Sequence, residues 1–232
     1  MRGFSFNGKN IKDFDCYVKK SELDPPSKNE IRESVPFMNG SYDFSSIYGG
    51  QIFNDRKIVY YIDLIEDDSA SLNIIKTNLE NWLLTVGEAE LFDSSIEGYY
   101  FIAKCMTVEE SDNEYSNYSE LKITFTAYPF KIRNEYEGEL IWDTFSFELD
   151  SLQDTLFMID GSDKVTIYNQ SATNIIPAII CSSNMEITKD NIIYNIPSGN
   201  SKSYQFEFKR GKNEMIITGR GQIEFKFKRE VL

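Results

Sequence analysis

The side chains that most often carry catalysis are scarce in this chain of 232 residues, which contains no histidine at all. Without an imidazole, Ser-His-Asp and Cys-His hydrolases and histidine-ligated zinc enzymes are excluded. The sequence also lacks a GxxxxGK[ST] phosphate loop, a GxGxxG motif and a GxSxG motif. Glycosidases need only two carboxylates, so this class stays open, but no acidic pair lies between aromatic platforms. We therefore expect no enzymatic activity and no cofactor.

The cysteines and acidic residues do not indicate a metal site either. Cys16, Cys105 and Cys181 are odd in number and far apart, which fits neither a disulfide framework nor a zinc site. We expect each to be a reduced, buried thiol. The acidic residues within 109–114 lack the spacing and the glycine of a calcium loop. They are better explained as the solvated tip of a hairpin, so no metal site is predicted.

The charge balance narrows the range of partners. The formal net charge is −13, which disfavours a wide basic face for nucleic acid and a polybasic membrane anchor. No run approaches 18 apolar residues, and the start has no apolar signal segment, so we expect synthesis in a cytoplasm and no membrane anchor. Residues 209–232 reverse the sign locally, with seven basic and three acidic side chains, and predict an exposed edge strand protected by Lys and Arg.

Apolar spacing in the first half predicts one helix among strands. The helix is expected over 70–86, with a capping residue within 67–69 and Gly87 as a left-handed stop. Asn7-Gly8 predicts a tight hairpin turn. Strands are expected at 14–18, 56–65, 99–108 and 120–130.

The second half predicts an all-β domain. Short strand-like runs alternate with turn signals, including Asp160-Gly161 and Gly219-Arg220-Gly221. Strands are expected at 140–149, 155–159, 164–168, 178–181, 185–187, 192–196, 203–208, 214–218 and 222–228. Such spacing favours a sandwich of two antiparallel sheets. The charged stretch 134–139 marks a boundary, so we expect domains over 1–133 and 134–232.

The segment 21–50 does not resemble an ordinary loop. It is polar and interrupted by Pro25, Pro26 and Pro36, yet it carries several isolated aromatic side chains. Long connections in compact domains tend to have a function. Its aromatic residues, and one neighbouring methionine, are our candidate contact residues: Phe37, Met38, Tyr42, Phe44 and Tyr48.

An ordered set of segments resembles the phage distal tail protein family over nearly the whole chain. These segments are FSFNGKNIKDFDCYV, VPFMNGSYDFSSIYGGQIFNDRKIVYYIDL, ENWL followed by AELFD and YYFIAKC, then PAIIC, PSGN and GKNEMIITGRGQIEFKFKREVL. Two positions depart from the family pattern, and both fall at turns. Asp15 stands where glycine follows Asp-Phe, and Phe37 stands where glycine follows Val-Pro.

This resemblance implies a mainly β protein with an N-terminal tube-protein-like β-sandwich, one α-helix and a C-terminal galectin-like β-sandwich. Six copies would form a ring at the distal tail or baseplate, joining the tail tube protein to the tail-associated hub or lysin protein. Tape measure and receptor-binding proteins are further implied partners, and DNA would pass through the channel without specific binding. The segment 21–50 would be a belt that reaches the next subunit. The implied location is the virion tail, after synthesis in the bacterial host cytoplasm.

A carbohydrate-binding β-sandwich that recognises host cell-surface glycans is the alternative. Sugars stack on exposed aromatic rings, and Trp142, Phe145 and Phe147 lie at alternate positions of an expected strand. Large aromatics at such spacing more often belong to a core. The two hypotheses differ in whether the segment 21–50 or an exposed ring is needed for function.

Overall fold

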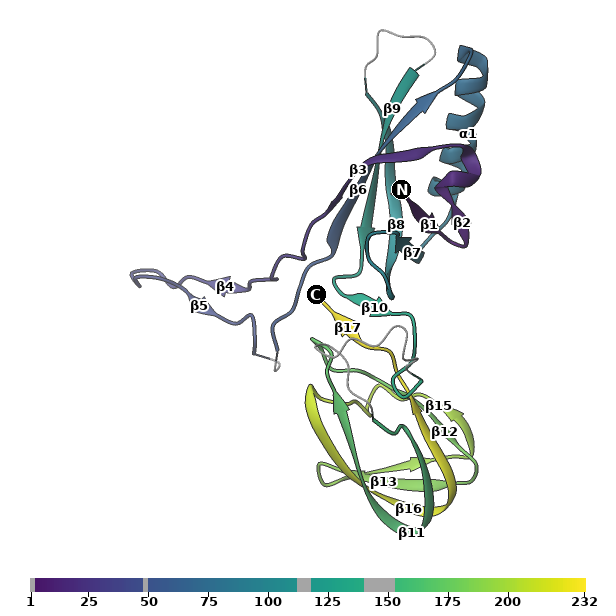
Figure 1. The fold of residues 1–232 in the computed structure, drawn as a ribbon. Helices are drawn as coiled ribbons and strands as arrows, with labels where there is room; N and C mark the ends of the chain where they lie inside the picture. The colour runs from purple at the N-terminus through teal and green to yellow at the C-terminus, as the bar shows by residue number, and fades with distance from the viewer. Residues whose placement is uncertain (1–2, 48–49, 112–117, 140–152) are drawn as a thin grey trace. The chain divides into compact units, whose positions relative to one another are not determined.

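The structure is a computed structural model that describes residues 3–47, 50–111, 118–139 and 153–232. Within these residues the chain is mainly β with one α-helix, which confirms the predicted fold class (Figure 1). Two compact units are present, Met1–Lys131 with Leu232, and Ile132–Val231. The tube-protein-like and galectin-like character of the units, and independent folding of 1–133 and 134–232, stay predictions.

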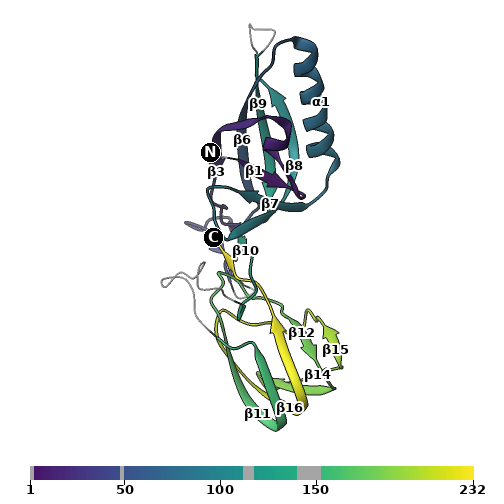
Figure 2. The same cartoon turned by 45° about the vertical axis from the view of Figure 1, so that its right-hand side comes forward.

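The first unit is built on one antiparallel sheet with the strand order β2-β1-β7-β8-β9-β6-β3. Helix α1 (Ser69–Thr85) lies over one face of this sheet (Figure 2). The strands are β1 (Phe4–Phe6), β2 (Lys9–Asn10), β3 (Tyr17–Leu23), β6 (Arg56–Ile65), β7 (Ala89–Asp93), β8 (Tyr99–Glu110) and β9 (Tyr118–Ala127).

Alternation along β6 and helical spacing along α1 explain how the two elements pack. The fully buried residues of β6 share one hydrophobic core with the helix, and they are Ile58, Tyr60 and Ile62. The helix adds four buried side chains, Leu72, Leu79, Trp82 and Leu83. Because β residues repeat every two positions and helix residues every 3.6, both stripes face the same core.

The helix ends differ in how well the sequence predicted them. Asp68 caps the start, its carboxylate accepting hydrogen bonds from the N–H groups of Ala70 and Ser71 at 2.8 and 2.9 Å, as expected of a cap. The end was predicted wrongly. The chain leaves the helix through Val86 in an extended conformation, with φ −84° and ψ 134°. Gly87 is therefore not needed as a left-handed stop.

The N-terminal hairpin forms at Asn7-Gly8, with φ values of 49° and 76°. Two positive values are what a two-residue turn matched to strand twist requires. The returning strand is Lys9–Asn10 and not 14–18 as predicted. A 3-10 helix, η1 (Ile11–Phe14), follows the hairpin with a reciprocal capping box of Asn10 and Asp13 at its start, and the next strand, β3, begins at Tyr17.

The second unit has the strand order β14-β13-β16-β12-β15, and β11 pairs with β16. Its strands are β11 (Leu156–Asn169), β12 (Ala178–Cys181), β13 (Met185–Lys189), β14 (Ile192–Ile196), β15 (Gly199–Ser201) and β16 (Gly211–Lys226). Two short strands, β10 (Lys131–Arg133) and β17 (Glu230–Val231), pair with each other. The predicted strand at 203–208 is wrong, since that segment makes a single bridge, Ile175 with Phe208.

Two predicted turns are bends inside long strands. Gly161 pairs with Gly219 in the middle of the β11–β16 ladder, and Gly219 and Gly221 have φ values of 153° and 129°. Glycine marks bulges and sharp bends as well as turns, which explains the misreading. The bend lets residues before it pair with β13 and residues after it pair with β12.

That pairing also overturns the edge-strand prediction. Strand β16 carries three of the seven basic residues, and it pairs with β11 along one edge and with β13 and then β12 along the other. Its basic residues alternate with buried ones such as Met215, Ile217 and Phe225. The charges of β16 itself therefore mark the solvent face of an internal strand, and the sequence pattern of such a face resembles that of an edge strand.

The cysteines behave as predicted. Cys16, Cys105 and Cys181 are free and buried. Burial raises the pKa of Cys16 and of Cys105 to about 12. They contribute to the cores as small hydrophobic groups and are unreactive as thiolates.

Candidate functional site

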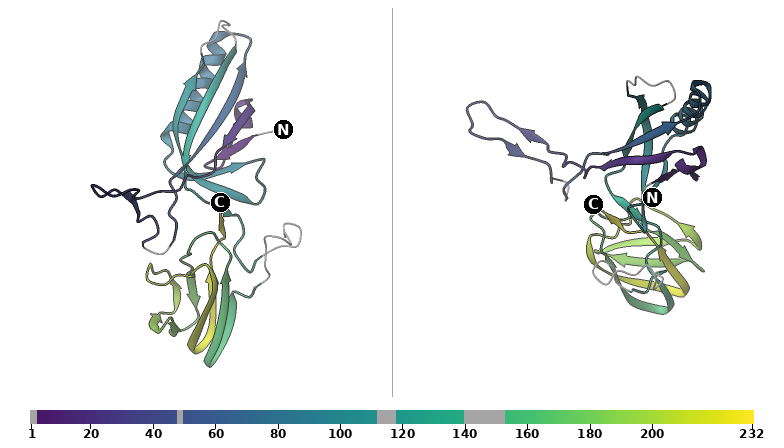
Figure 3. Two further views of the ribbon diagram at one scale, coloured as in Figure 1. Left: turned by 90° about the vertical axis from the view of Figure 1, so that its left-hand side faces the viewer. Right: turned by 45° about the horizontal axis from the view of Figure 1, so that its top comes forward.

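A two-stranded extension, which we call the arm (residues 24–55), leaves the first unit where β3 and β6 end. Figures 1 and 3 show it projecting from the sheet. Its base follows the last β3–β6 pair, Leu23 with Ile58. Farther out, β4 (Arg32–Glu33) pairs with β5 (Tyr42–Asp43). The predicted belt, 21–50, begins inside β3 and ends before the arm does.

Backbone hydrogen bonds hold the arm together near its base. The N–H of Asn29 donates to the carbonyl of Ile52 at 2.8 Å, and the N–H of Asn54 donates to that of Ser27 at 2.9 Å. The N–H of Ile31 donates to the hydroxyl of Ser45 at 2.8 Å. Ser45 is the arm's one buried residue within the described part of the chain. The arm therefore has a defined backbone without a core.

Most large apolar side chains of the arm face solvent, whereas Phe53 near its base is half-buried, with its ring centroid 5.6 Å from that of Phe130. Phe37 is fully exposed, and six others are 38–63% exposed: Ile31, Val35, Tyr42, Phe44, Ile47 and Ile52. No described arm residue belongs to either hydrophobic core. Large apolar side chains that are exposed together on one segment are typical of interaction sites in folded proteins. The arm is thus the candidate functional site.

The candidate contact residues are placed as follows. Tyr42, in β5, and Phe44, directly after it, have ring centroids 6.2 Å apart, so they form one aromatic patch. Met38 is half-buried and its N–H donates to the carbonyl of Val35 at 3.1 Å, closing the turn that holds Phe37. Tyr48 lies outside the described residues. Contact with another subunit stays a prediction for all of them.

Sequence reasoning missed the aliphatic part of this surface. Ile31, Val35, Ile47 and Ile52 are exposed alongside the aromatics. The signal was available, because branched apolar residues in a proline-interrupted polar segment have no helical or strand periodicity that would bury them. Reading aromatics alone gave only half of the surface.

The two departures from the family pattern share one backbone feature. Asp15 has φ 55° and Phe37 has φ 67°. Both take the left-handed region, where glycine is favoured and a bulky residue such as phenylalanine is rare. Aspartate tolerates this region better than most residues. Both turns therefore have the backbone conformation that favours glycine, although non-glycine residues occupy them.

Electrostatics in the arm are local and exposed. Arg32 lies 3.1 Å from a carboxylate oxygen of Glu30 and 3.7 Å from one of Asp43. Hydrogen bonds from Ser45, and secondarily the charge of Arg32, lower the pKa of Asp43. Such exposed pairs contribute little stability, about 0–1 kcal/mol. They fix the local shape of the arm more than they stabilise it.

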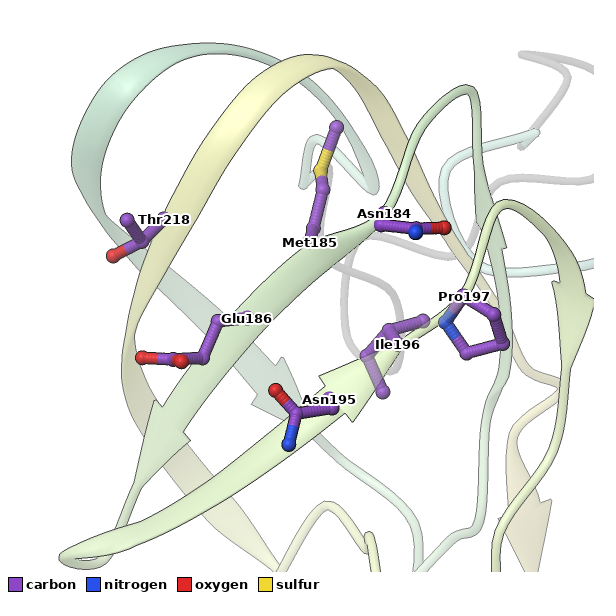
Figure 4. A pocket seen from close by; sticks show the side chains of 7 residues that line it. All are labelled: Asn184, Met185, Glu186, Asn195, Ile196, Pro197 and Thr218. Atoms are coloured by element: carbon purple, nitrogen blue, oxygen red, sulfur yellow. The ribbon is translucent and has the colours of Figure 1, made fainter.

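A groove of about 520 Å³ in the second unit is the place where a sugar would be sought (Figure 4). Glu186 is the cross-strand neighbour of both Asn195 and Thr218, so three polar side chains line one row. The other lining residues are Asn184, Met185, Ile196 and Pro197. None is aromatic, so the groove has no stacking platform, and Trp142, Phe145 and Phe147 lie outside the described residues.

The described residues contain neither a metal site nor a membrane-spanning helix. Over residues 3–47, 50–111, 118–139 and 153–232, no three Cys, Asp or Glu side chains converge as a metal site would need. No helix in the same residues is long and apolar enough to cross a membrane. The exposed apolar residues of the arm have no role in either hydrophobic core, so the arm stays the candidate functional site.

Comparison with known proteins gives the fold and no sequence relative. No family model matches the chain, and no curated protein matches it. Among solved structures, the chain is similar to the Dit protein of phage SPP1, described as a paradigm of the hub adsorption apparatus in phages that infect Gram-positive bacteria. The match has a TM-score of 0.68 and 11% identity, and it covers 100% of both chains.

Two further matches are weaker. Both are structures of the phage p2 baseplate in its activated conformation, one with strontium and one with calcium, at TM-scores of 0.44 and 0.42 and identities of 9% and 10%. They cover 99% and 100% of this chain and 98% of the matched chains. The first match shows that the chain shares its fold over the full length with the SPP1 protein.

Proposed function

We propose that this protein is a structural subunit of a bacteriophage tail tip, in which six copies form a ring. The observation that carries the proposal is the full-length similarity in fold to the SPP1 hub protein. Function does not follow from a fold alone, so the exposed arm is the second support. A hub subunit needs surfaces for its neighbours, and the arm is an apolar surface without a core.

The arm supplies what ring formation requires. A closed ring uses a heterologous contact, in which two different patches of each subunit meet. One patch is the arm, where Phe37, Tyr42 and Phe44 would each act as an anchor, since exposed aromatics dominate binding energy once buried. Pro25 and Pro36 restrict the unbound chain, which reduces the entropy lost when the arm is ordered. The other patch lies on the next copy.

In this proposal the ring connects the tail tube protein to the tail-associated hub or lysin protein, near the tape measure and receptor-binding proteins. DNA passes through its channel without specific binding, because 37 acidic against 24 basic side chains repel phosphates. The protein functions in the virion tail and has no catalytic role of its own.

The test compares the intact chain with an arm-deleted variant. Residues 24–55 are replaced by a short Gly-Ser linker, which is feasible because Leu23 and Ile58 are paired at the base. Light scattering after size-exclusion chromatography should give a particle of about six subunits for the intact chain and a monomer for the variant. Circular dichroism and urea unfolding should show that the variant remains folded.

A matched point variant separates the arm's surface from its mere presence. Tyr42→Ser with Phe44→Ser removes the aromatic patch and keeps the backbone, so assembly should weaken while the unfolding midpoint stays unchanged. The exposed helix residue Ile74→Ser serves as the control, because it removes apolar surface elsewhere. A ring formed equally well without the arm would refute the proposed contact, and an intact chain that is monomeric at all concentrations would refute the homo-ring.

A further inference from the structure

Arg56 is a buried cation on the apolar face of the first sheet. It is the first residue of β6, two positions before Ile58, and so lies on the core face of the strand. The residue is 5% exposed, and its Nε atom has no hydrogen-bond partner among the residues that the structure describes. Burial lowers the pKa of Arg56. A buried charge without a partner is unfavourable, so its presence needs a reason.

The neighbours of Arg56 in the sheet are unusually small. It is paired with Ala127 of β9, which is paired with Ala103 of β8, which is paired with Ala89 of β7. Directly paired residues share a face, so one row across four strands holds an arginine and three alanines. The guanidinium carbon lies 5.1 Å from the centre of the Phe101 ring. This cation–π contact is favourable but supplies no hydrogen bonds.

A second cation lies close to the first. Burial, and then the charge of Arg56, lower the pKa of Lys131. Among the ion pairs of the described residues, none includes Arg56 or Lys131. Like charges in a partly desolvated place repel each other, and an incoming anion would relieve both of them.

The other unit shows how this chain treats a buried arginine that serves stability. Arg229 is almost fully buried, and its Nε donates a hydrogen bond to Oε1 of the equally buried Glu137 at 2.9 Å. There the fold supplies its own acid. At Arg56 the described residues supply none, although the chain has an excess of acidic residues. The missing acid is therefore best sought outside the chain.

We propose that Arg56 and Lys131 form the cationic half of a carboxylate-binding site that the arm of a second copy of this chain completes. This rests on the proposed ring. Guanidinium binds carboxylate through paired hydrogen bonds. The arm carries three acids without an ion pair among the described residues, Asp24, Glu33 and Asp55. A phosphate ligand is disfavoured by the net charge of −13.

The experiment measures stability and assembly of the same variants. Arg56→Met keeps the length and apolar stem of the side chain and removes the charge. In dilute, monomeric protein its urea midpoint should equal or exceed that of wild type, because an unpaired buried charge has been removed. Association measured by sedimentation should weaken about thirtyfold or more. Arg229→Met is the matched control and should lower the urea midpoint instead.

A second variant identifies the source of the carboxylate. Asp24→Asn, Glu33→Gln and Asp55→Asn combined should weaken association, and adding Arg56→Met should weaken it little further, because both changes remove one interaction. The proposed site would be overturned if Arg56→Met assembled like wild type, or if it lost as much stability as Arg229→Met. It would also be overturned if the effects of Arg56→Met and of the three acid substitutions on association were additive. If wild type itself stays monomeric, the ring fails along with the proposed occupant. If wild type and all variants assemble equally, only the site fails.

Discussion

Two long antiparallel ribbons in this chain treat their apolar side chains in opposite ways. The β11–β16 ribbon runs for 14 residue pairs, and its inward residues Ile167 and Ile217 are fully buried. The arm is also a ribbon of extended chain, yet seven of its large apolar residues are 38% exposed or more, and only Met38 and Phe53 among the described ones are half-buried. The difference comes from a covering layer. Strands β12 and β13, which pair with β16, contribute buried residues to the same core, whereas no described residue of the arm belongs to either core.

Removing one aromatic ring from each ribbon should give the largest difference in stability between the two. Phe225→Ala leaves a cavity in a packed core and should lower the free energy of unfolding by about 4 kcal/mol. Phe37→Ala removes a ring that contacts little and should change it by about 0.5 kcal/mol or less. Urea unfolding of both variants measures this. Equal losses would mean that the arm is covered within its own chain.

Charged pairs give the next largest contrast. Glu137→Ala removes the buried carboxylate that Arg229 contacts and should lower the free energy of unfolding by about 3 kcal/mol. Arg32→Ala removes exposed contacts of the arm and should cost about 0–1 kcal/mol. Thermal or urea unfolding distinguishes them. If Arg32→Ala proved as costly as Glu137→Ala, the arm would carry stability that its exposure does not suggest.

Backbone strain gives a smaller contrast, of opposite sign in the two ribbons. Gly221→Ala places a methyl group against Ser182 at φ 129° and should destabilise by about 2 kcal/mol. Phe37→Gly relieves a phenylalanine at φ 67°, while the freer unfolded chain offsets that gain, so the net change should be about 0.5 kcal/mol or less. Calorimetry can rank the two. A stable Gly221→Ala variant would show that the bend is not fixed by its glycine.

The smallest effect is the pH response of the arm. Ser45, and then Arg32, lower the pKa of Asp43. A depressed folded pKa adds stability above the unfolded pKa, and this is lost as pH falls through the folded pKa. An NMR titration of the Asp43 carboxyl should show a midpoint below the ordinary aspartate value, and Ser45→Ala should raise it. An unchanged midpoint in Ser45→Ala would contradict the assigned cause.

Apolar periodicity along the sequence was sufficient to predict an element's bounds where its burial depends on that element alone. The sequence gives the bounds of β6, β12 and β14 as the structure has them, and the helix within one residue at each end. These segments carry a period that matches one buried face or one buried stripe. Asp68 was within the predicted capping range because a side-chain oxygen before an apolar stripe has few other roles.

Pattern failed where the answer depends on distant segments. Glycine at 219 and 221 reads as a turn, but it is a bend inside β16, and only pairing with β12 and β13 distinguishes the two. The row of Arg56 with Ala127, Ala103 and Ala89 follows from register across four strands. Neither residue type nor spacing along the chain contains that information.

The way the arm joins the sheet has a mechanical consequence. Both of its strands enter from the same end of β3 and β6, which are paired from Tyr17 with Asp63 to Leu23 with Ile58. A pull on the tip therefore draws β3 and β6 in one direction and does not unzip them from each other. The load passes to the ladder between β6 and β9, where ten residue pairs from Arg56–Ala127 to Ile65–Tyr118 share it. A subunit held by such an arm would transmit force into the middle of its sheet.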